Sequence, residues 1–114
     1  MKVVIYHNTR CRKSRGGLEF LKNHTDDFEI VEYLKTGLSP EDISKLLKQL
    51  NLKVQDIIRT QEDIYKKELK GKNFTNDEWI SIISDNLKLL KRPIIVKGNK
   101  AVIGETEDAV ASLF

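Results

Sequence analysis

The chain has 114 residues, of which 39% are hydrophobic and 32% charged, a composition typical of a soluble globular protein with one hydrophobic core. It contains no apolar run near the roughly 20 residues that a membrane-spanning helix needs and no recognisable signal peptide, so we expect a cytoplasmic location and no membrane partner. The net charge of +3 is too small for a nucleic-acid coat protein, and we expect no direct contact with nucleic acid.

The single cysteine, Cys11, excludes an internal disulfide and a self-contained dithiol pair. Any redox cycle in this chain must therefore take its second thiol from another molecule. Two histidines and one cysteine at these spacings do not make a convincing metal site. We accordingly expect no bound metal and no bound cofactor.

The N-terminal part of the chain predicts a strand, a helix and a second strand. Residues 2–7 are a short apolar run rich in β-branched side chains, which favours a buried strand. A turn then brings Cys11 to the start of a helix whose inner face carries Ser14 and Leu21. Residues 28–33 predict the second strand. We expect the two strands of this unit to be parallel and joined by a right-handed crossover, as is nearly always the case.

The middle of the chain, about residues 39–90, predicts a helical insert. A serine cap before Pro40 and two acidic residues after it form a strong helix start. A capping box at residues 75–78 begins another helix, with an apolar stripe that runs from Trp79 to Leu90. Shorter helical stretches are expected at residues 54–59 and 62–69.

The C-terminal part predicts two strands and a closing helix. Pro93 ends the helical region, because proline disfavours a helical residue before it. Residues 93–96 and 101–103 predict strands joined by a tight turn, and residues 106–114 predict a helix. The order βαβ, then helices, then ββα indicates a single α/β domain over residues 1–114.

Cys11 is the strongest candidate for chemistry. A thiol at a strand-to-helix turn meets free backbone N–H groups and the positive end of the helix, and both favour the thiolate. Nearby cations act in the same direction, and such surroundings lower a cysteine pKa from ~8.5 to about 3.5–7.5. These cations are Arg10, Arg12, Lys13 and Arg15. The alternative is a buried structural cysteine, which is common for free cysteines.

Four other residues are candidates for the same site. Ser14 stands where a dithiol enzyme carries its second cysteine, and its hydroxyl can donate to a thiolate; the alternative is a small residue packed on the sheet. His7 ends the first strand and can tune or protonate the thiol, or simply serve as a polar strand end. Arg59 and Arg92 stand at element boundaries, and guanidinium groups suit tetrahedral oxyanions, although most arginines are merely solvated.

Three segments resemble the glutaredoxin-dependent arsenate reductases. Residues 7–15 are similar to the active-site loop of these enzymes, residues 57–59 with Tyr65 to a second motif, and residues 91–96 to a third, in order and at similar spacings. The resemblance implies a thioredoxin-like fold, with a mixed four-stranded sheet and a helical insertion between the βαβ and ββα units. It also implies that the peptide bond before Pro93 is cis.

The resemblance further implies an activity. Cys11 attacks arsenate and forms a thiolate–arsenic(V) adduct; glutathione, as co-substrate, displaces an oxygen at arsenic; glutaredoxin takes the mixed disulfide and arsenite leaves. The site residues it assigns are Cys11, His7 and Ser14 for catalysis and Arg59, Arg92 and Pro93 for substrate binding.

Two positions depart from the pattern of these reductases. Thr9 replaces the usual proline, and Glu105 replaces a third oxyanion-binding arginine. A carboxylate about 5 Å from a unit negative charge costs about 3 kcal/mol at an effective dielectric constant near 20.

Two alternatives to an arsenate reductase therefore stay open. One is a redox regulator of the Spx type that binds RNA polymerase, although such regulators commonly use a Cys-x-x-Cys pair that Ser14 breaks here. The other is a glutathione-linked reductase of another substrate.

Overall fold

The computed structural model describes residues 2–114, which are built around a mixed sheet with the strand order β2-β1-β3-β4. Its strands are β1 (Val3–Tyr6), β2 (Phe28–Val31), β3 (Ile94–Lys97) and β4 (Lys100–Ile103). β1 and β2 run parallel, as the strand–helix–strand order predicts, whereas β3 is antiparallel to both β1 and β4. The predicted α/β class with a four-stranded mixed sheet is therefore confirmed.

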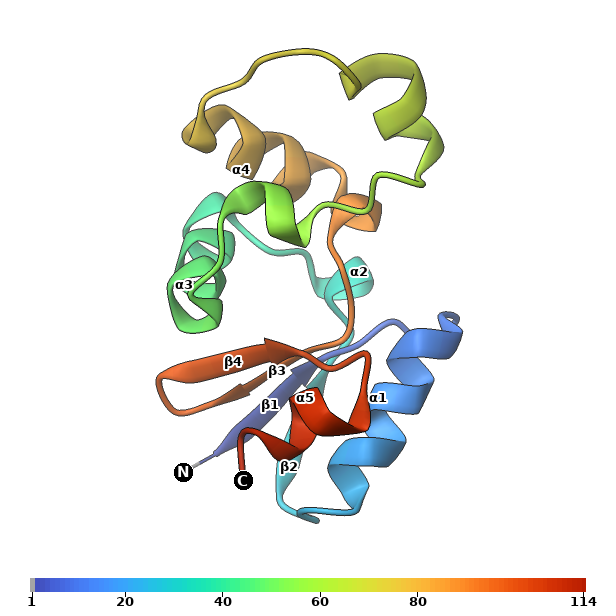
Figure 1. The fold of residues 1–114 in the computed structure, drawn as a ribbon, viewed down its shortest axis with the longest axis vertical. Helices are drawn as coiled ribbons and strands as arrows, with labels where there is room; N and C mark the ends of the chain where they lie inside the picture. The colour runs from blue at the N-terminus through green and yellow to red at the C-terminus, as the bar shows by residue number, and fades with distance from the viewer. Residues whose placement is uncertain (1) are drawn as a thin grey trace.

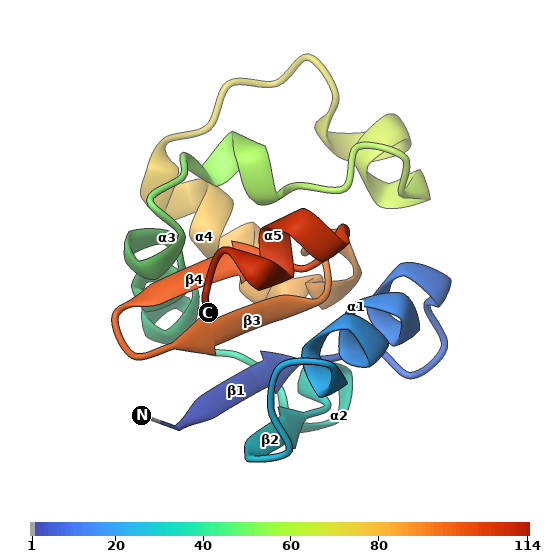
Figure 2. The same ribbon diagram turned by 60° about the horizontal axis from the view of Figure 1, so that its bottom comes forward.

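One face of the sheet is covered by α1 (Arg12–Lys22) and α5 (Glu107–Ala111), which lie in front of the strands in Figure 2. Successive side chains of a strand point to opposite faces, so alternate residues of β1 and β3 meet these two helices. The buried side chains between the sheet and the helices are Val3, Ile5, Leu21, Ile95 and Val110.

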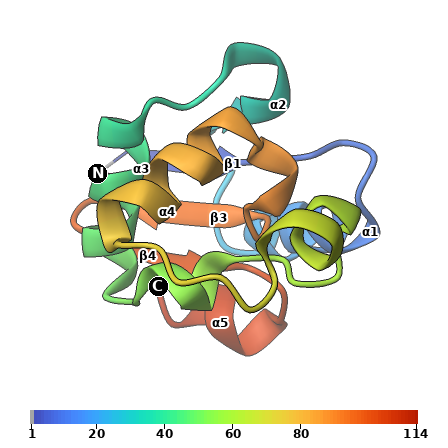
Figure 3. The same cartoon turned by 90° about the horizontal axis from the view of Figure 1, so that it is seen from above.

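The other face is covered by the helical insert, chiefly α3 (Pro40–Leu50) and α4 (Asn76–Asp85). These helices lie above the sheet in Figure 1, and the view from above in Figure 3 shows them over the strands. Both begin with a capping box, formed by Ser39 with Asp42 in α3 and by Thr75 with Glu78 in α4. Ile94 and Val96 of β3 point into this larger core, because they alternate with residues that face α1.

The predicted apolar stripe that reaches Leu90 is not a single helix. α4 ends at Asp85, and Asn86 (φ −138°, ψ 70°) turns the chain into the short 3₁₀ turn η3 (Leu87–Leu89). Leu90 then forms an isolated antiparallel bridge with Ile58. This bridge needs extended backbone at Leu90, so the spacing of apolar residues predicts which side chains are buried but not where the helix ends.

The stretches predicted as helices at residues 54–59 and 62–69 are shorter and differently wound. η1 (Val54–Ile57) is a 3₁₀ turn, and η2 (Tyr65–Leu69) is a wide π-type turn. The insert is therefore made of two regular helices and several single turns. No helix in the described part of the chain is long and apolar enough to cross a membrane.

The strand predicted at residues 28–33 is two residues too long. β2 ends at Val31, and Tyr33 begins the short helix α2 (Tyr33–Thr36). β2 stops there because Val31 pairs with Tyr6, the last residue of β1, so no ladder partner remains for the residues that follow. The change of direction leaves the side chain of Tyr33 fully buried.

Three segments leave the sheet side by side at one edge. Tyr6 pairs with Val31 at the end of β2 and with Ile94 at the start of β3. The loop after β1, the turn into α2 and the residues before β3 therefore meet at the carboxyl edge of the parallel strands, where α/β proteins place their sites. The bond between Arg92 and Pro93 at this edge is cis, as the resemblance implies.

Candidate active site

Cys11 is the N-cap residue of α1, just beyond the end of β1. Asn8 shapes the loop before it: the carbonyl of Asn8 accepts a hydrogen bond from the Cys11 N–H at 3.1 Å, and its side-chain oxygen accepts one from the Arg10 N–H at 3.1 Å. The Cys11 carbonyl accepts the first helical hydrogen bond, from the Arg15 N–H at 2.9 Å. These hydrogen bonds hold the cysteine at the helix end. It is only half-buried, so it remains within reach of a substrate.

The surroundings of Cys11 favour the thiolate. Burial is the largest single effect and raises the pKa of the thiol, but the hydrogen bond and charge of the Arg92 guanidinium, together with backbone N–H groups, outweigh it, and the net pKa is lower than that of an ordinary cysteine. The N–H groups are those of Ser14 and Lys13, although the sulfur makes no capping hydrogen bond of standard geometry. The first turn of α1 contains no acidic residue, so the sulfur supplies the negative charge that this helix end stabilises.

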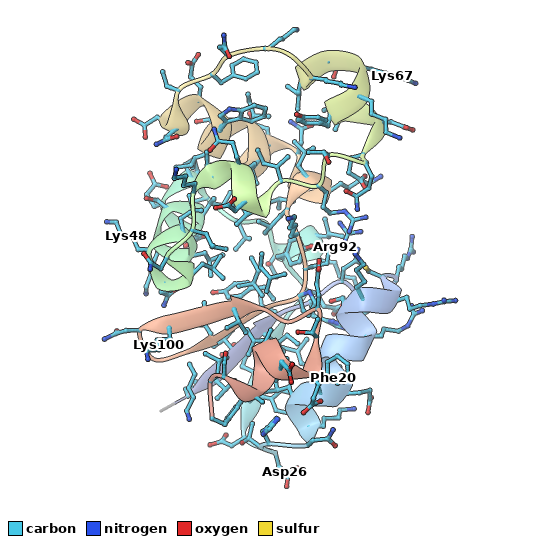
Figure 4. All side chains as sticks on the ribbon, in the orientation of Figure 1. Phe20, Asp26, Lys48, Lys67, Arg92 and Lys100 are labelled. Carbon is cyan, nitrogen blue, oxygen red and sulfur yellow. The ribbon has the colours of Figure 1, made fainter. Side chains whose placement is uncertain are left out.

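Arg92 approaches the sulfur from the segment before β3. Its side chain is 9% exposed, and its Nη1 donates to the carbonyl of Lys88 at 3.1 Å. Figure 4 shows Arg92 at the junction between the helical insert and the sheet. Pro93 is itself buried, against Gly17 of α1, so it fixes the point at which Arg92 leaves the sheet.

His7 and Ser14 form a buried pair behind the Cys11 loop. The His7 Nδ1 and the Ser14 Oγ are 2.7 Å apart, and the same Oγ accepts a hydrogen bond from the Asn8 N–H at 2.9 Å. Burial lowers the pKa of His7, so the imidazole is neutral at pH 7. The predicted hydrogen bond from the Ser14 hydroxyl to the sulfur is not among these contacts, and Ser14 acts on Cys11 through its backbone N–H.

Arg59 lies beside the segment that leads to Arg92 and is paired with a counter-charge. Its backbone N–H donates to the carbonyl of Leu89 at 2.7 Å, which places it beside the segment that leads to Arg92. The Oε2 of Glu62 accepts a hydrogen bond from the Arg59 Nε at 3.3 Å and lies 3.3 Å from its Nη2. Both side chains are mostly buried. Arg92, and not Arg59, is therefore the guanidinium that lowers the pKa of Cys11.

The cations next to Cys11 in the sequence do not carry the role predicted for them. Their side chains are exposed in all four cases: Arg10, Arg12, Lys13 and Arg15. The Nη1 of Arg15 donates to the carbonyl of Thr9 at 3.0 Å, and the Nζ of Lys13 lies 4.0 Å from the Oε1 of Glu105. The thiolate is favoured instead by a guanidinium from a segment about 80 residues away in the sequence and by the helix N–H groups.

The sequence model of the ArsC family matches residues 6–113. The chain belongs to the ArsC family. An arsenate reductase of Haemophilus influenzae is 33% identical over 115 residues, which cover 99% of each chain. A protein of Escherichia coli K12 named YfgD is 37% identical over 114 residues, 98% of this chain and 96% of its own. A solved structure of an arsenate reductase from Vibrio cholerae matches with a TM-score of 0.92 and 34% identity, over 100% of this chain and 98% of that one. The predicted thioredoxin-like fold is confirmed.

A hollow of about 230 Å³ opens beside the active-site loop of this ArsC family member. It lies between the loop after β1 and the turn from β2 into α2, and it is lined by His7, Asn8, Thr9, Arg10, Glu32, Leu34 and Lys35. Arg10 and Lys35 place two cations at its rim. Among the described residues, no group of three or more His, Cys, Asp or Glu side chains is arranged to hold a metal ion.

Two residues of the site escape the sequence analysis. Glu62 stands three residues after Arg59, and this spacing alone signals a possible ion pair on a turn. Tyr33 gives no such signal, because the residues around it predict a strand. The Tyr33 side chain is buried, and burial raises its pKa to about 12. The charge of the Arg92 guanidinium acts in the opposite direction but is the smaller effect.

Proposed function

We propose that this chain is an arsenate reductase in which Cys11 is the nucleophile and glutathione, with glutaredoxin, supplies the reducing thiols. The observation that supports this most directly is the Arg92 guanidinium beside a thiol at a helix N-terminus, since both groups stabilise the thiolate. Membership of the ArsC family and the names of the relatives point to the same reaction.

The proposed reaction conserves atoms and electrons. The Cys11 thiolate attacks arsenic(V), an As–S bond forms, and one oxygen leaves as water after protonation. Glutathione then displaces a second oxygen at arsenic, which also leaves as water. The Cys11 and glutathione sulfurs join in a mixed disulfide as arsenic gains two electrons, and one water adds to arsenic(III) so that arsenite is released. A second glutathione thiol, acting through glutaredoxin, reduces the mixed disulfide and returns the Cys11 thiol. Overall, one arsenate and two glutathione thiols yield one arsenite, one glutathione disulfide and one water. With a single cysteine in the chain, the second thiol must be external.

The remaining residues have roles that follow from their positions. Arg92 and Arg59 would bind the oxyanion, because guanidinium groups match two oxygens of a tetrahedral anion. His7 and Ser14 would hold the loop and tune the thiol, with the neutral imidazole bonded to the Ser14 hydroxyl. Pro93 would position Arg92. No bound cofactor is needed for this chemistry.

We place glutathione in the hollow beside the loop. Glutathione carries two carboxylates and an ammonium group; Arg10 suits a carboxylate, while Lys35 lies 3.4 Å from the carboxylate of Glu32, an ion pair that can meet both charges. Its thiol would then approach Cys11 from the side of Asn8 and Thr9. Glutathione and glutaredoxin act where thiols are kept reduced, so a cytoplasmic location belongs to the same proposal.

The test is a coupled assay with arsenate, glutathione, glutaredoxin, glutathione reductase and NADPH. We expect arsenate-dependent oxidation of NADPH, with arsenite as product, and no such activity in Cys11→Ser. Replacing glutaredoxin with thioredoxin should abolish turnover if the reductant is assigned correctly. Absence of arsenite formation by the wild-type protein under all these conditions would contradict the proposed activity.

A glutathione-linked reductase of a less anionic substrate is the second candidate. Glu105 favours it, because this carboxylate is paired with Lys13 and reduces the positive charge near Cys11. Glutathione-dependent reduction of neutral disulfides, without reduction of arsenate, would support this candidate over the first. Binding to RNA polymerase stays a prediction of the resemblance alone.

A further inference from the structure

Two buried polar groups beside Cys11 have no hydrogen bond of standard geometry to any of the described residues. They are the hydroxyl of Tyr33 and the Nε of Arg92. The Tyr33 side chain is 0% exposed and that of Arg92 is 9% exposed. Buried polar groups are nearly always paired, because an unpaired one loses its hydrogen bonds to water without replacement. Two unpaired groups in one place therefore point to a missing partner.

The topology of the sheet brings these two groups to Cys11. Tyr33 follows the end of β2 and Arg92 precedes the start of β3, while Cys11 follows the end of β1. The three strands are neighbours in the sheet and end in register, so these segments leave it at the same edge. The buried Tyr33 hydroxyl therefore lies at the same edge as the Cys11 sulfur and the Arg92 guanidinium.

The electrostatics agree with this placement. Burial raises the pKa of Tyr33 to about 12; the charges of Arg92 and Arg59 and the approach of the Arg92 guanidinium to the hydroxyl lower it, and the charge of a Cys11 thiolate raises it. The hydroxyl thus keeps its proton at neutral pH, and it is close enough to the thiolate and to both guanidinium groups to be affected by their charges. A protonated phenol is a hydrogen-bond donor.

The chemistry of the unpaired groups identifies the kind of partner. A guanidinium Nε–H is a donor only, and the phenol hydroxyl has a proton to donate. The group that can satisfy both is an acceptor, and an oxygen of a tetrahedral oxyanion is such an acceptor. We infer that the Tyr33 hydroxyl is a third hydrogen-bond donor for the anion bound at Cys11, alongside Arg92 and Arg59. This inference rests on the proposed function.

The hydroxyl is covered in the free protein, so the inference also requires a movement. The Nη1 of Arg92 donates to the Lys88 carbonyl at 3.1 Å in the free site. The inference requires the guanidinium to turn toward a bound anion and so uncover the Tyr33 hydroxyl. A donor that becomes available only with the anion contributes little to the pKa of the free thiol and much to the affinity for the anion.

The experiment compares Tyr33→Phe with Tyr6→Phe. Each variant loses one hydroxyl, and Tyr6 lies on β1 beside Lys2, Asp42 and Gln49, outside the site. The dissociation constants of arsenate and phosphate are measured by the protection that each anion gives Cys11 against iodoacetamide. We expect the constants to rise about tenfold in Tyr33→Phe, the effect of one hydrogen bond to a charged group, and to stay unchanged in Tyr6→Phe. The thiol titration without anion should be the same in both variants.

A second readout does not depend on the folding of Tyr33→Phe. The chain has three tyrosines, so in Tyr6→Phe/Tyr65→Phe the fluorine NMR signal of incorporated 3-fluorotyrosine belongs to Tyr33. We expect arsenate and phosphate to shift this signal. The inference is overturned if the wild-type protein binds an anion but Tyr33→Phe binds it equally well, or if bound anion leaves the signal in place. Failure of arsenate turnover with normal anion binding would instead count against the proposed function alone.

Discussion

Gly17 lies directly against the ring of Pro93, with no room between them for a side chain. A methyl group on Gly17 would collide with the Pro93 ring and with the carbonyl oxygen of Gly104. This contact holds α1, which carries Cys11 at its start, against the segment that carries Arg92. A glycine that takes no part in the chemistry thus allows the helix of Cys11 and the segment of Arg92 to pack closely.

We expect Gly17→Ala to lower the free energy of unfolding by about 1–3 kcal/mol, the usual cost of overpacking a buried contact. It should also raise the pKa of Cys11, because α1 and Arg92 are pushed apart. Gly16→Ala is the matched control, since nothing lies within 4 Å of a methyl group there, and alanine favours a helix over glycine by about 1 kcal/mol. Urea unfolding measures the stability of both variants, and the pH dependence of alkylation measures the pKa of Cys11. Equal stability of the two variants would show that the Gly17 contact can relax.

Removal of the Arg92 guanidinium should make Cys11 less reactive at neutral pH. Arg92 lowers the pKa of the thiol, so Arg92→Gln raises it, and the fraction of thiolate at pH 7 falls. We expect alkylation by iodoacetamide at pH 7 to slow about tenfold, the effect of one hydrogen bond to a charged group, and the pH–rate profile to move to higher pH.

Arg59→Gln is the control for this prediction. Arg59 is bound by Glu62 and is not among the groups that lower the pKa of Cys11. The pH–rate profile of Arg59→Gln should therefore match that of the wild-type protein, while its affinity for anions falls. If both variants shift the profile equally, the thiolate is stabilised by the overall positive charge of the site rather than by Arg92.

The features that the sequence predicts well are those that depend on local patterns. The strand before Cys11 and the cap at Ser39 depend on residues within a few positions of each other, and both are found where expected. The cis bond at Pro93 is implied only by the family resemblance. Leu90 marks the limit of local patterns, because its bridge to Ile58 is a long-range contact that helical spacing cannot reveal.

The candidate site shows the same limit. Cys11 and the N–H groups that stabilise its thiolate belong to one turn, and sequence reasoning places them correctly. It assigns the stabilising charge to the neighbours of Cys11, because nothing in the local sequence shows that Arg92 reaches the sulfur. Tyr33 is missed for a similar reason: its inward position depends on where β1 ends and not on its own surroundings in the sequence.

Glu62 limits the charge that Arg59 can offer to a substrate. Its carboxylate contacts two nitrogens of the guanidinium at 3.3 Å, so an anion must compete with it. We expect Glu62→Gln to lower the dissociation constant of arsenate or phosphate several-fold, because a neutral amide leaves the Arg59 charge unpaired. Anion protection of Cys11 against alkylation gives the constant. Asp63→Asn removes the same charge from the next, exposed residue and should have little effect; an equal gain in both variants would indicate net charge as the cause.

Glu105 carries a negative charge next to the first turn of α1, the helix that begins at Cys11. Its carboxylate lies 4.0 Å from the Lys13 ammonium, so it neutralises a cation in the first turn of α1. Glu105→Arg removes a negative charge and adds a positive one, and we expect arsenate to bind at least tenfold more tightly. The interaction of each charge with the anion is about 3 kcal/mol at 5 Å before solvent screening reduces it. Glu68→Arg makes the same change of charge on the exposed η2 turn as a control. If Glu105→Arg binds arsenate no better than Glu68→Arg, Glu105 does not face the anion, and it cannot be the residue that sets substrate preference.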